Sequence, residues 1–386
     1  MLIFFKNALL LIVIIRIAVS AQTQDPSNPD FSAPKQIPGM VLVWNDEFNG
    51  SGKPDPGSWS YENGFVRNQE LQWYQSDNAT VKGGVLLIEG KKEQIKNPNF
   101  ISGSSDWKLS RQYASYTSAS IHSSGKRSWK FGHFEIRARI DSSKGSWPAI
   151  WTLGISGEWP SNGEIDILEF YRINNTPSIL ANFAWGTQTR WTAKWDGANK
   201  PLSYFLSKDP KWIQKFHLWT MDWNKDTIKL SIDGELMNET LLNSTLNADG
   251  SNPFLQPHYI LLNLALGSNG GDPSNSVYPI KYEVDYVRVY QKGTAVKYHP
   301  ADTDAGITIL NVKKSVFSVI LPAFNFSKMN LQSFSIYNLE GALVLKGKLI
   351  SNDQSNSFFF NAKLEKGTYC ITFSDSGIKP QKIIVH

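Results

Sequence analysis

The sequence has almost no cysteine. Cys370 is the only one among 386 residues, which excludes an intramolecular disulfide, so the fold must depend on packing. Charge is also sparse, at 19% of residues against 41% apolar residues, and this balance excludes an intrinsically disordered chain. The net charge of +5 is spread without a long basic run, and we therefore predict no nucleic-acid partner.

Long hydrophobic runs are absent beyond the N-terminus. There, Lys6 precedes a strongly apolar stretch over residues 8–15, and the segment ends in small residues at 18–21. This pattern predicts a signal peptide over residues 1–21, cleaved after Ala21, and hence a secreted or cell-surface protein. The alternative is an uncleaved membrane anchor. Because Arg16 interrupts the apolar run well short of a bilayer's thickness, we predict no stable membrane span.

Long helical periodicity is lacking too, and short β-prone runs broken by Gly, Pro, Asn and Asp take its place. They lie at residues 85–89, 132–140, 227–233, 259–265 and 282–290. Residues 134–140 alternate apolar and charged side chains, as expected of a strand with one face in water. We predict an all-β protein whose main unit, residues 39–291, is a large sandwich.

Two irregular segments flank this unit. Residues 22–38 are rich in Pro, Ser, Asn and Asp and predict an exposed linker, and residues 292–314 predict a second one. Residues 315–386 form a small C-terminal β unit, with strand candidates at 334–337, 342–346, 358–362, 368–373 and 381–385.

Aromatic side chains are plentiful, with 14 Trp and 14 Tyr. Flat amphipathic rings suit the apolar faces of sugars while their polar edges stay hydrogen-bonded. The alternative for any single Trp is that it fills the β core.

Three acids lie within six residues, at Glu164, Asp166 and Glu169. Strand alternation puts Glu164 and Asp166 on one face and sends Glu169 to the other. A β-bulge around Ile167 and Leu168 would return Glu169 to the acidic face. Cleavage of a glycosidic bond with retention needs two carboxyl groups close together, one as nucleophile and one as acid and then base.

A middle carboxyl would help to divide the work. Hydrogen-bonded to Glu164, Asp166 would orient it and shift the pKa values of the acids apart, leaving Glu169 protonated as the general acid. The alternative is a solvated, charged strand face. Gly163, which allows close backbone approach, and the mutual repulsion of three like charges on one face both argue against that alternative.

The acid run resembles the signature of glycoside hydrolase family 16 in its bulged form. A longer match covers residues 145–154 (GSWPAIWTLG) and 159–164 (WPSNGE), which are similar to the family's laminarinase-like β-glucanases. Further matches lie at 44–48 (WNDEF), 68–74 (NQELQWY), 116–119 (YTSA) and 284–290 (VDYVRVY). The resemblance implies a β-jelly-roll sandwich with a concave substrate cleft, Glu164 as nucleophile, Asp166 as its assistant and Glu169 as acid/base.

The same resemblance implies the other site residues. Those expected to line the cleft and bind substrate are Asn68, Glu70, Trp147, Trp151 and Trp159. No cofactor is expected for catalysis. A structural calcium is implied at Glu47, Gly84 and Asp285, which match the family's metal positions weakly.

The chain departs from the family pattern at two places. Ser120 stands where laminarinases have a basic residue after Thr-Ser-Ala, so a basic cleft residue is missing, and His122 follows on a segment expected near the cleft. A family histidine after the catalytic strand is absent, and Trp185 or Asn182 takes its place at the sugar, with a packing role as the alternative. These changes leave catalysis intact and leave the preferred glycan open.

The C-terminal unit resembles a sorting domain of the type IX secretion system, through residues 334–341, 364–369 and 382–385. The resemblance implies the secretion machinery as a partner. The alternative is a carbohydrate-binding β-sandwich, which the absence of Trp after Trp223 disfavours.

Three functions follow, and the polysaccharide substrate is the partner common to them. The first is a monomeric, endo-acting retaining hydrolase of β-1,3- or mixed β-1,3/1,4-glucan. The second is an algal galactan hydrolase acting on agar or porphyran. The third is a glycan-binding protein that lost catalysis, against which the intact acid run argues.

Overall fold

The computed structural model describes residues 25–292 except 34, 36 and 38, and beyond residue 292 only the strands β20 to β28. The predicted signal peptide, residues 1–21, lies outside the described residues. No helix in the described part of the chain is both long and apolar enough to cross a membrane.

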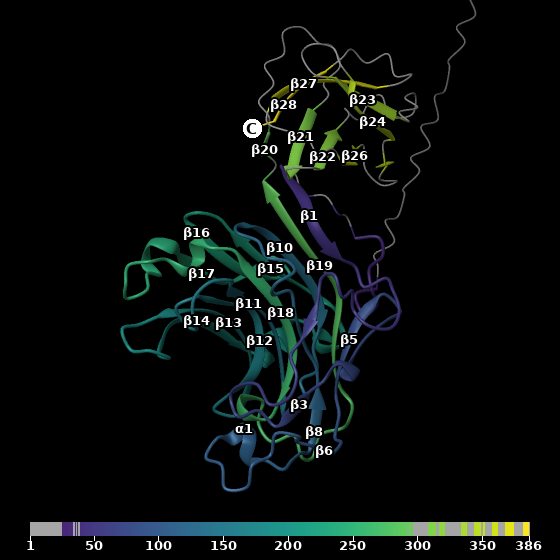
Figure 1. The fold of residues 1–386 in the computed structure, drawn as a ribbon. Helices are drawn as coiled ribbons and strands as arrows, with labels where there is room; N and C mark the ends of the chain where they lie inside the picture. Colours follow the sequence, from purple (N-terminus) through teal and green to yellow (C-terminus); the bar gives the residue numbers. More distant parts are fainter. Residues whose placement is uncertain are drawn as a thin grey trace, which may run out of the picture.

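Two antiparallel sheets make up most of the described chain (Figure 1). The eight-stranded sheet has the order β17 (Glu235–Leu241), β16 (Thr227–Ile232), β15 (His217–Trp223), β10 (Gly132–Arg139), β19 (Ile280–Lys292), β5 (Val85–Gly90) and β4 (Ala79–Lys82), with β1 (Met40–Asp46) also on β19. The seven-stranded sheet has the order β14 (Ala193–Pro201), β13 (Thr176–Gly186), β12 (Glu164–Ile173), β11 (Ser146–Gly154), β18 (His258–Leu266), β9 (Ser120–His122) and β2 (Ser60–Tyr61). The five strands predicted in this unit are confirmed within two residues at each end.

Shorter elements connect these sheets. Two more pairs of strands are β3 (Gln72–Tyr74) with β8 (Tyr116–Ser118), and β6 (Ile95–Lys96) with β7 (Tyr113–Ala114). The helices are α1 (Trp107–Ser110), α2 (Leu202–Lys208), η1 (Ser76–Asn78), η2 (Trp212–Gln214), η3 (Leu242–Ser244), η4 (Pro253–Leu255) and η5 (Ser268–Gly270).

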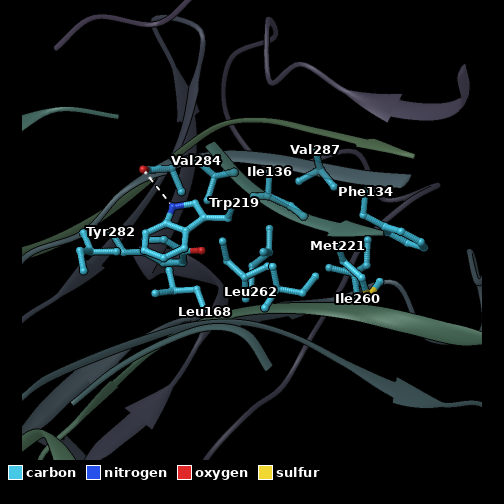
Figure 2. Close-up of a cluster of buried hydrophobic side chains, with 14 of the residues drawn as sticks. Phe134, Ile136, Leu168, Trp219, Met221, Ile260, Leu262, Tyr282, Val284 and Val287 are labelled. Carbon is cyan, nitrogen blue, oxygen red and sulfur yellow. Dashed lines mark hydrogen bonds between the residues drawn. The ribbon is translucent and has the colours of Figure 1, made fainter. Parts of the chain in front are cut away.

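The main core lies between the two large sheets. In β10 the alternation predicted from sequence holds, because Phe134, Ile136 and Ala138 all face the core. Figure 2 shows side chains of this sheet meeting Ile260 and Leu262 from β18 of the other sheet. The core packs against the inner face of the seven-stranded sheet. The outer face of this sheet is therefore available for a cleft.

The lead-in segment packs on the outer face of the eight-stranded sheet. Arg137 donates to the carbonyl of Asn28 (3.0 Å) and Arg139 to that of Ser27 (3.0 Å). Residues 25, 26, 28, 31 and 32 are exposed, as expected of the predicted linker over residues 22–38, and the segment is nevertheless hydrogen-bonded to the sheet. The charged face of β10 offers guanidinium donors to the carbonyls of this irregular segment, which would otherwise lack protein partners.

The C-terminal strands form two sheets of their own. One has the order β20 (Thr294–Ala295), β21 (Thr308–Lys313), β22 (Val316–Ile320), β26 (Ser357–Asn361) and β25 (Ile350–Ser351); the other has β24 (Leu343–Lys348), β23 (Ser333–Tyr337), β27 (Gly367–Phe373) and β28 (Gln381–Val385). β20 and β21 lie within residues 292–314, the segment for which the sequence predicts a linker, and β21 pairs with β22.

Candidate active site

The acidic strand β12 carries the bulge that the sequence predicts. Asp166 lies opposite Trp151 and Leu168 opposite Ile150 on β11, which leaves Ile167 without a partner. Ile167 and Leu168 therefore both face the core. Because two successive side chains point inward, Glu169 returns to the face that already carries Asp166.

A cleft of about 1270 Å³ lies on the outer face of the seven-stranded sheet. The structure brings together there eight of the predicted site residues, namely Asn68, Glu70, Trp147, Trp151, Trp159, Glu164, Asp166 and Glu169. Gly163, just before the acid run, has φ +79°, and a Cβ there would lie 2.8 Å from Pro253. Glycine thus lets β12 begin close against a neighbouring loop.

Glu164 accepts a hydrogen bond that stabilises its ionised form. The indole N–H of Trp159 donates to its Oε2 at 2.6 Å. Desolvation raises the pKa of Glu164, while the hydrogen bonds of Trp159 and Asp166 and the charge of Arg67 oppose that rise. These partners favour the ionised carboxylate.

Asp166 lies between the two glutamates and is 1% exposed. Desolvation raises its pKa well above the ordinary value, and the negative charges of Glu164 and Glu169 raise it further. A protonated Asp166 donates a hydrogen bond to Glu164, which stabilises the charge of that neighbour.

Glu169 sits between two donors. The indole N–H of Trp147 reaches Oε1 at 3.0 Å, and the amide of Asn182 reaches Oε2 at 2.9 Å. Desolvation, followed by the charge of Glu164, raises the pKa of Glu169 to about 7. A carboxyl with that pKa can give up a proton and take it back near neutral pH.

Other residues in and beside the cleft form a polar network. Glu70 is 2% exposed and accepts from Gln72 at 2.6 Å and from Asn68 at 3.3 Å. Trp151 donates to Asn263 at 2.7 Å. The partners of these side chains fix their orientation before any ligand arrives.

Trp185 does not line the cleft, which corrects the sequence-based assignment. On β13 it shares the core face with Ala181 and Phe183, whereas Asn182 has the opposite parity and faces the cleft. Because side chains alternate along a strand, only one of Asn182 and Trp185 could reach the sugar. Asn182 is that residue.

His122 lies one residue away from the cleft rather than on its surface. Its ring packs edge-on against Tyr259 (6.2 Å between centroids), and Tyr259 itself lines the cleft. Burial lowers the pKa of His122. His122 therefore supports Tyr259, which lines the cleft.

The residues implied for calcium do not fit the ion. Glu47 accepts two hydrogen bonds from Arg288, at 2.9 and 2.8 Å, and Asp285 is ion-paired with Arg137. Calcium is held by several oxygen ligands, and here both carboxylates are already engaged by guanidinium groups. The part of the chain that the structure describes contains no group of three His, Cys, Asp or Glu side chains able to hold a metal. The ring of Phe31 fills the space beside Gly84, since a Cβ at that position would lie 2.5 Å from it.

Several cleft residues escaped prediction. They include Glu62, Arg67, Trp107, Tyr171, Trp195 and Tyr259. Trp195 is 50% exposed on β14, opposite Ala184 of β13. An aromatic on the exposed edge strand of an otherwise polar segment was the signal that could have identified it.

Residues 71–288 match the family model described as "Glycosyl hydrolases family 16". The chain is 35% identical over 284 residues to a beta-glucanase of Rhodothermus marinus, which covers 66% of this chain and 87% of that protein.

The chain also aligns with solved structures. One reported for endo-acting O-glycanases of the human gut microbiota aligns with a TM-score of 0.61 and 35% identity, over 67% of this chain and 94% of that one. The laminarinase catalytic domain of Thermotoga maritima aligns with a TM-score of 0.55 and 29% identity, over 65% and 98%.

Proposed function

Because the chain belongs to glycosyl hydrolases family 16 and is a glycoside hydrolase, we propose that it is a secreted, endo-acting, retaining enzyme that cleaves β-1,3- or mixed β-1,3/1,4-glucan. The observation that carries the proposal is the unequal surroundings of Glu164 and Glu169 on one face of β12. Desolvation raises the pKa of both carboxyls. At Glu164 the charge of Arg67 opposes the rise, whereas at Glu169 the charge of Glu164 adds to it and the pKa reaches about 7. The names of the Rhodothermus and Thermotoga relatives support a glucan substrate.

The first step uses this difference directly. A carboxylate oxygen of Glu164 attacks the anomeric carbon and forms a C–O bond while the glycosidic C–O bond breaks. The proton on Glu169 moves to the departing oxygen, so the leaving sugar departs as a neutral alcohol. Asp166 keeps its hydrogen bond to the reacting Glu164. This bond stabilises the negative charge of the Glu164 carboxylate in the buried site.

The second step reverses the roles. The carboxylate of Glu169 removes a proton from a water molecule, whose oxygen attacks the anomeric carbon. The bond to Glu164 breaks, and Glu164 leaves as a carboxylate. Trp147 and Asn182 stabilise the charge on Glu169 between the two steps through their N–H groups.

A second candidate substrate is a mucin-type O-glycan. It is favoured by the alignment with the gut O-glycanase structure, at a TM-score of 0.61. An algal galactan stays a third candidate within the same chemistry.

Export is part of the proposal. The apolar N-terminal segment and the small residues before Ala21 support secretion. The resemblance of the C-terminal strands to a type IX sorting domain supports a role in that export, and we expect the enzyme to act as a monomer.

The test is reducing-sugar release from laminarin, lichenan, agarose and mucin O-glycans by the full chain and by Glu164→Gln. We expect laminarin or lichenan to be cleaved and the variant to lose about 10⁴-fold or more in kcat. Proton NMR of the first product should show the β anomer, as retention requires.

Glu158→Gln is the matched control, since Glu158 is an exposed carboxylate paired with Arg190 at 2.8 Å. It should keep the wild-type rate. A wild type that binds these glycans but cleaves none of them would leave only the glycan-binding function, and an α anomer as first product would exclude retention.

A further inference from the structure

The cleft contains a single cation among its described lining residues, and the family pattern does not predict it. The charged lining residues are Glu62, Arg67, Glu70, Glu164, Asp166 and Glu169. Five of the six are acids. Arg67 therefore dominates the positive potential at this surface.

Arg67 is firmly placed. Its Nη2 is ion-paired with Glu62, and Glu62 is in turn held by the hydroxyl of Ser120, whose Oγ donates to Oε2 at 2.6 Å. Ser120 is the residue that stands where laminarinases carry a basic side chain. The positive charge missing at position 120 thus enters the cleft from a different segment, through a bridge that Ser120 itself anchors.

The guanidinium of Arg67 also covers an aromatic surface. It lies over the ring of Trp151 with its Cζ 5.0 Å from the centroid. Trp151 is only 8% exposed, whereas the Arg67 side chain keeps 22% of its surface accessible. The sequence predicts that the indole of Trp151 contacts the sugar. In the structure the planar guanidinium of Arg67 covers that indole and is the surface that a sugar reaches first.

The strand register brings this pair to the catalytic acids. Trp151 lies directly opposite Asp166 across β11 and β12, and Glu164 is two residues from Asp166 on the same strand face. Glu169, by contrast, lies opposite Ala149. The cation thus belongs to the nucleophile's end of the acid run.

We propose that Arg67 is a positioning and specificity-determining residue, which supplies the positive charge beside the nucleophile Glu164 and forms, with Trp151 beneath it, the surface that the sugar of that subsite contacts. The roles of Glu164 and of the sugar rest on the proposed function. Balanced by Glu62 and surrounded by acids, Arg67 suits neutral sugar hydroxyls rather than a sulfated or uronic sugar.

The charge of Arg67 leads to a prediction about the pKa of Glu164. The charge of Arg67 opposes the desolvation that raises the pKa of Glu164. The other titratable groups facing the pair are Glu62, Glu70, Tyr74, Tyr259, Asp166 and Glu169. Burial lowers the pKa of His122, and the charge of Arg67 lowers it further. Removing the cation should raise the pKa of Glu164.

The experiment compares Arg67→Gln and Arg67→Lys on whichever panel glycan the wild type cleaves. We expect Arg67→Gln to move the acid limb of the kcat/KM profile to higher pH and to lower kcat/KM at pH 6 at least tenfold. Arg67→Lys should restore the acid limb but keep a raised KM, because lysine has the charge without the planar surface.

Arg190→Gln is the matched control. Arg190 is also paired with a glutamate and lies over Trp191 at 4.9 Å, yet its side chain is 72% exposed and it does not line the cleft. It should leave the acid limb in place.

A readout without substrate separates the two proposals. The ¹³C NMR titration of the Glu164 carboxyl should shift upward in Arg67→Gln and stay near the wild type in Arg67→Lys. An active wild type whose acid limb and titration do not move in Arg67→Gln, with unchanged KM in Arg67→Lys, would overturn the role of Arg67 and leave the proposed function standing. A wild type that cleaves nothing overturns the proposed function, while the titration still decides whether Arg67 acts on Glu164.

Discussion

The outer faces of the two sheets carry buried carboxylates in opposite settings. On the eight-stranded sheet, each of three acids meets an arginine, in the pairs Glu47 with Arg288, Asp285 with Arg137 and Glu283 with Arg139. On the seven-stranded sheet, Glu164, Asp166 and Glu169 take part in none of the ion pairs found among the described residues. The three acids on the eight-stranded sheet are each paired with an arginine, whereas the three acids of β12 are not.

The pKa values of Glu47 and Glu169 show this difference, although at Asp285 desolvation outweighs the hydrogen bonds and charge of Arg137 and the pKa is raised. At Glu47 burial raises the pKa, but the hydrogen bonds and charge of Arg288 outweigh it and the pKa falls below the ordinary value. At Glu169 nothing of that strength opposes burial, and the pKa rises to about 7. Paired acids thus hold structure together, whereas unpaired acids are available for proton transfer.

The largest expected effect is on catalysis at the unpaired face. Glu169→Gln cannot donate or accept the proton, so kcat/KM for a polysaccharide should fall about 10²- to 10⁴-fold. Steady-state kinetics on the glycan that the wild type cleaves would measure it. Glu239→Gln, on the exposed β17 strand, is the control and should keep full activity; equal losses in both would contradict the assignment.

At the paired face, the expected effect is on stability. Arg288→Met leaves the Glu47 carboxylate without its main partner, and the free energy of unfolding should fall by about 3–5 kcal/mol. Urea unfolding would measure the loss. The double variant Arg288→Met/Glu47→Gln removes the stranded charge and should recover much of it; a double variant as unstable as the single one would show that packing, and not charge, is lost.

A smaller effect is expected on the pH dependence of stability at the unpaired face. The pKa of Glu169 is about 7 in the folded protein against 4.5 ordinarily, so the folded state binds more protons between these values. The free energy of unfolding contributed by this group is therefore full below pH 4.5 and is lost as pH rises through 7. Glu169→Gln should unfold at a higher Tm than the wild type at pH 8 and at a similar Tm at pH 4. A lower Tm at pH 8 would contradict the sign.

No effect is expected from metal removal. Since arginines occupy the carboxylates of Glu47 and Asp285, EDTA should leave Tm unchanged in thermal unfolding. A Tm that falls with EDTA and returns with calcium would show that these pairs do not replace an ion.

Much of this arrangement could be predicted from sequence, because it is local. Glu164, Asp166 and Glu169 can lie on one face of a strand only if one extra residue is inserted between Asp166 and Glu169. The bulge at Ile167 and Leu168 therefore follows from the spacing of these three acids alone. The strand alternation of β10 is equally local and was predicted correctly.

Features that depend on distant partners could not be predicted. The sequence left open whether Trp185 or Asn182 contacts the sugar and whether Trp185 packs instead; the parity of β13 turns Trp185 into the core. Arg67 gave no local signal, since its effect depends on Trp151 from another strand and Glu62 from a loop. The hydrogen bonds of the lead-in segment could not be predicted, because their donors, Arg137 and Arg139, lie more than a hundred residues later.

The most direct test of the contrast between the two faces is a ¹³C NMR titration of the Glu169 carboxyl in the free protein, assigned with Glu169→Gln. We predict a midpoint at about pH 7. A midpoint at or below the ordinary value of 4.5 would contradict it, because Glu169 would then be as fully stabilised in its charged form as the arginine-paired Glu47.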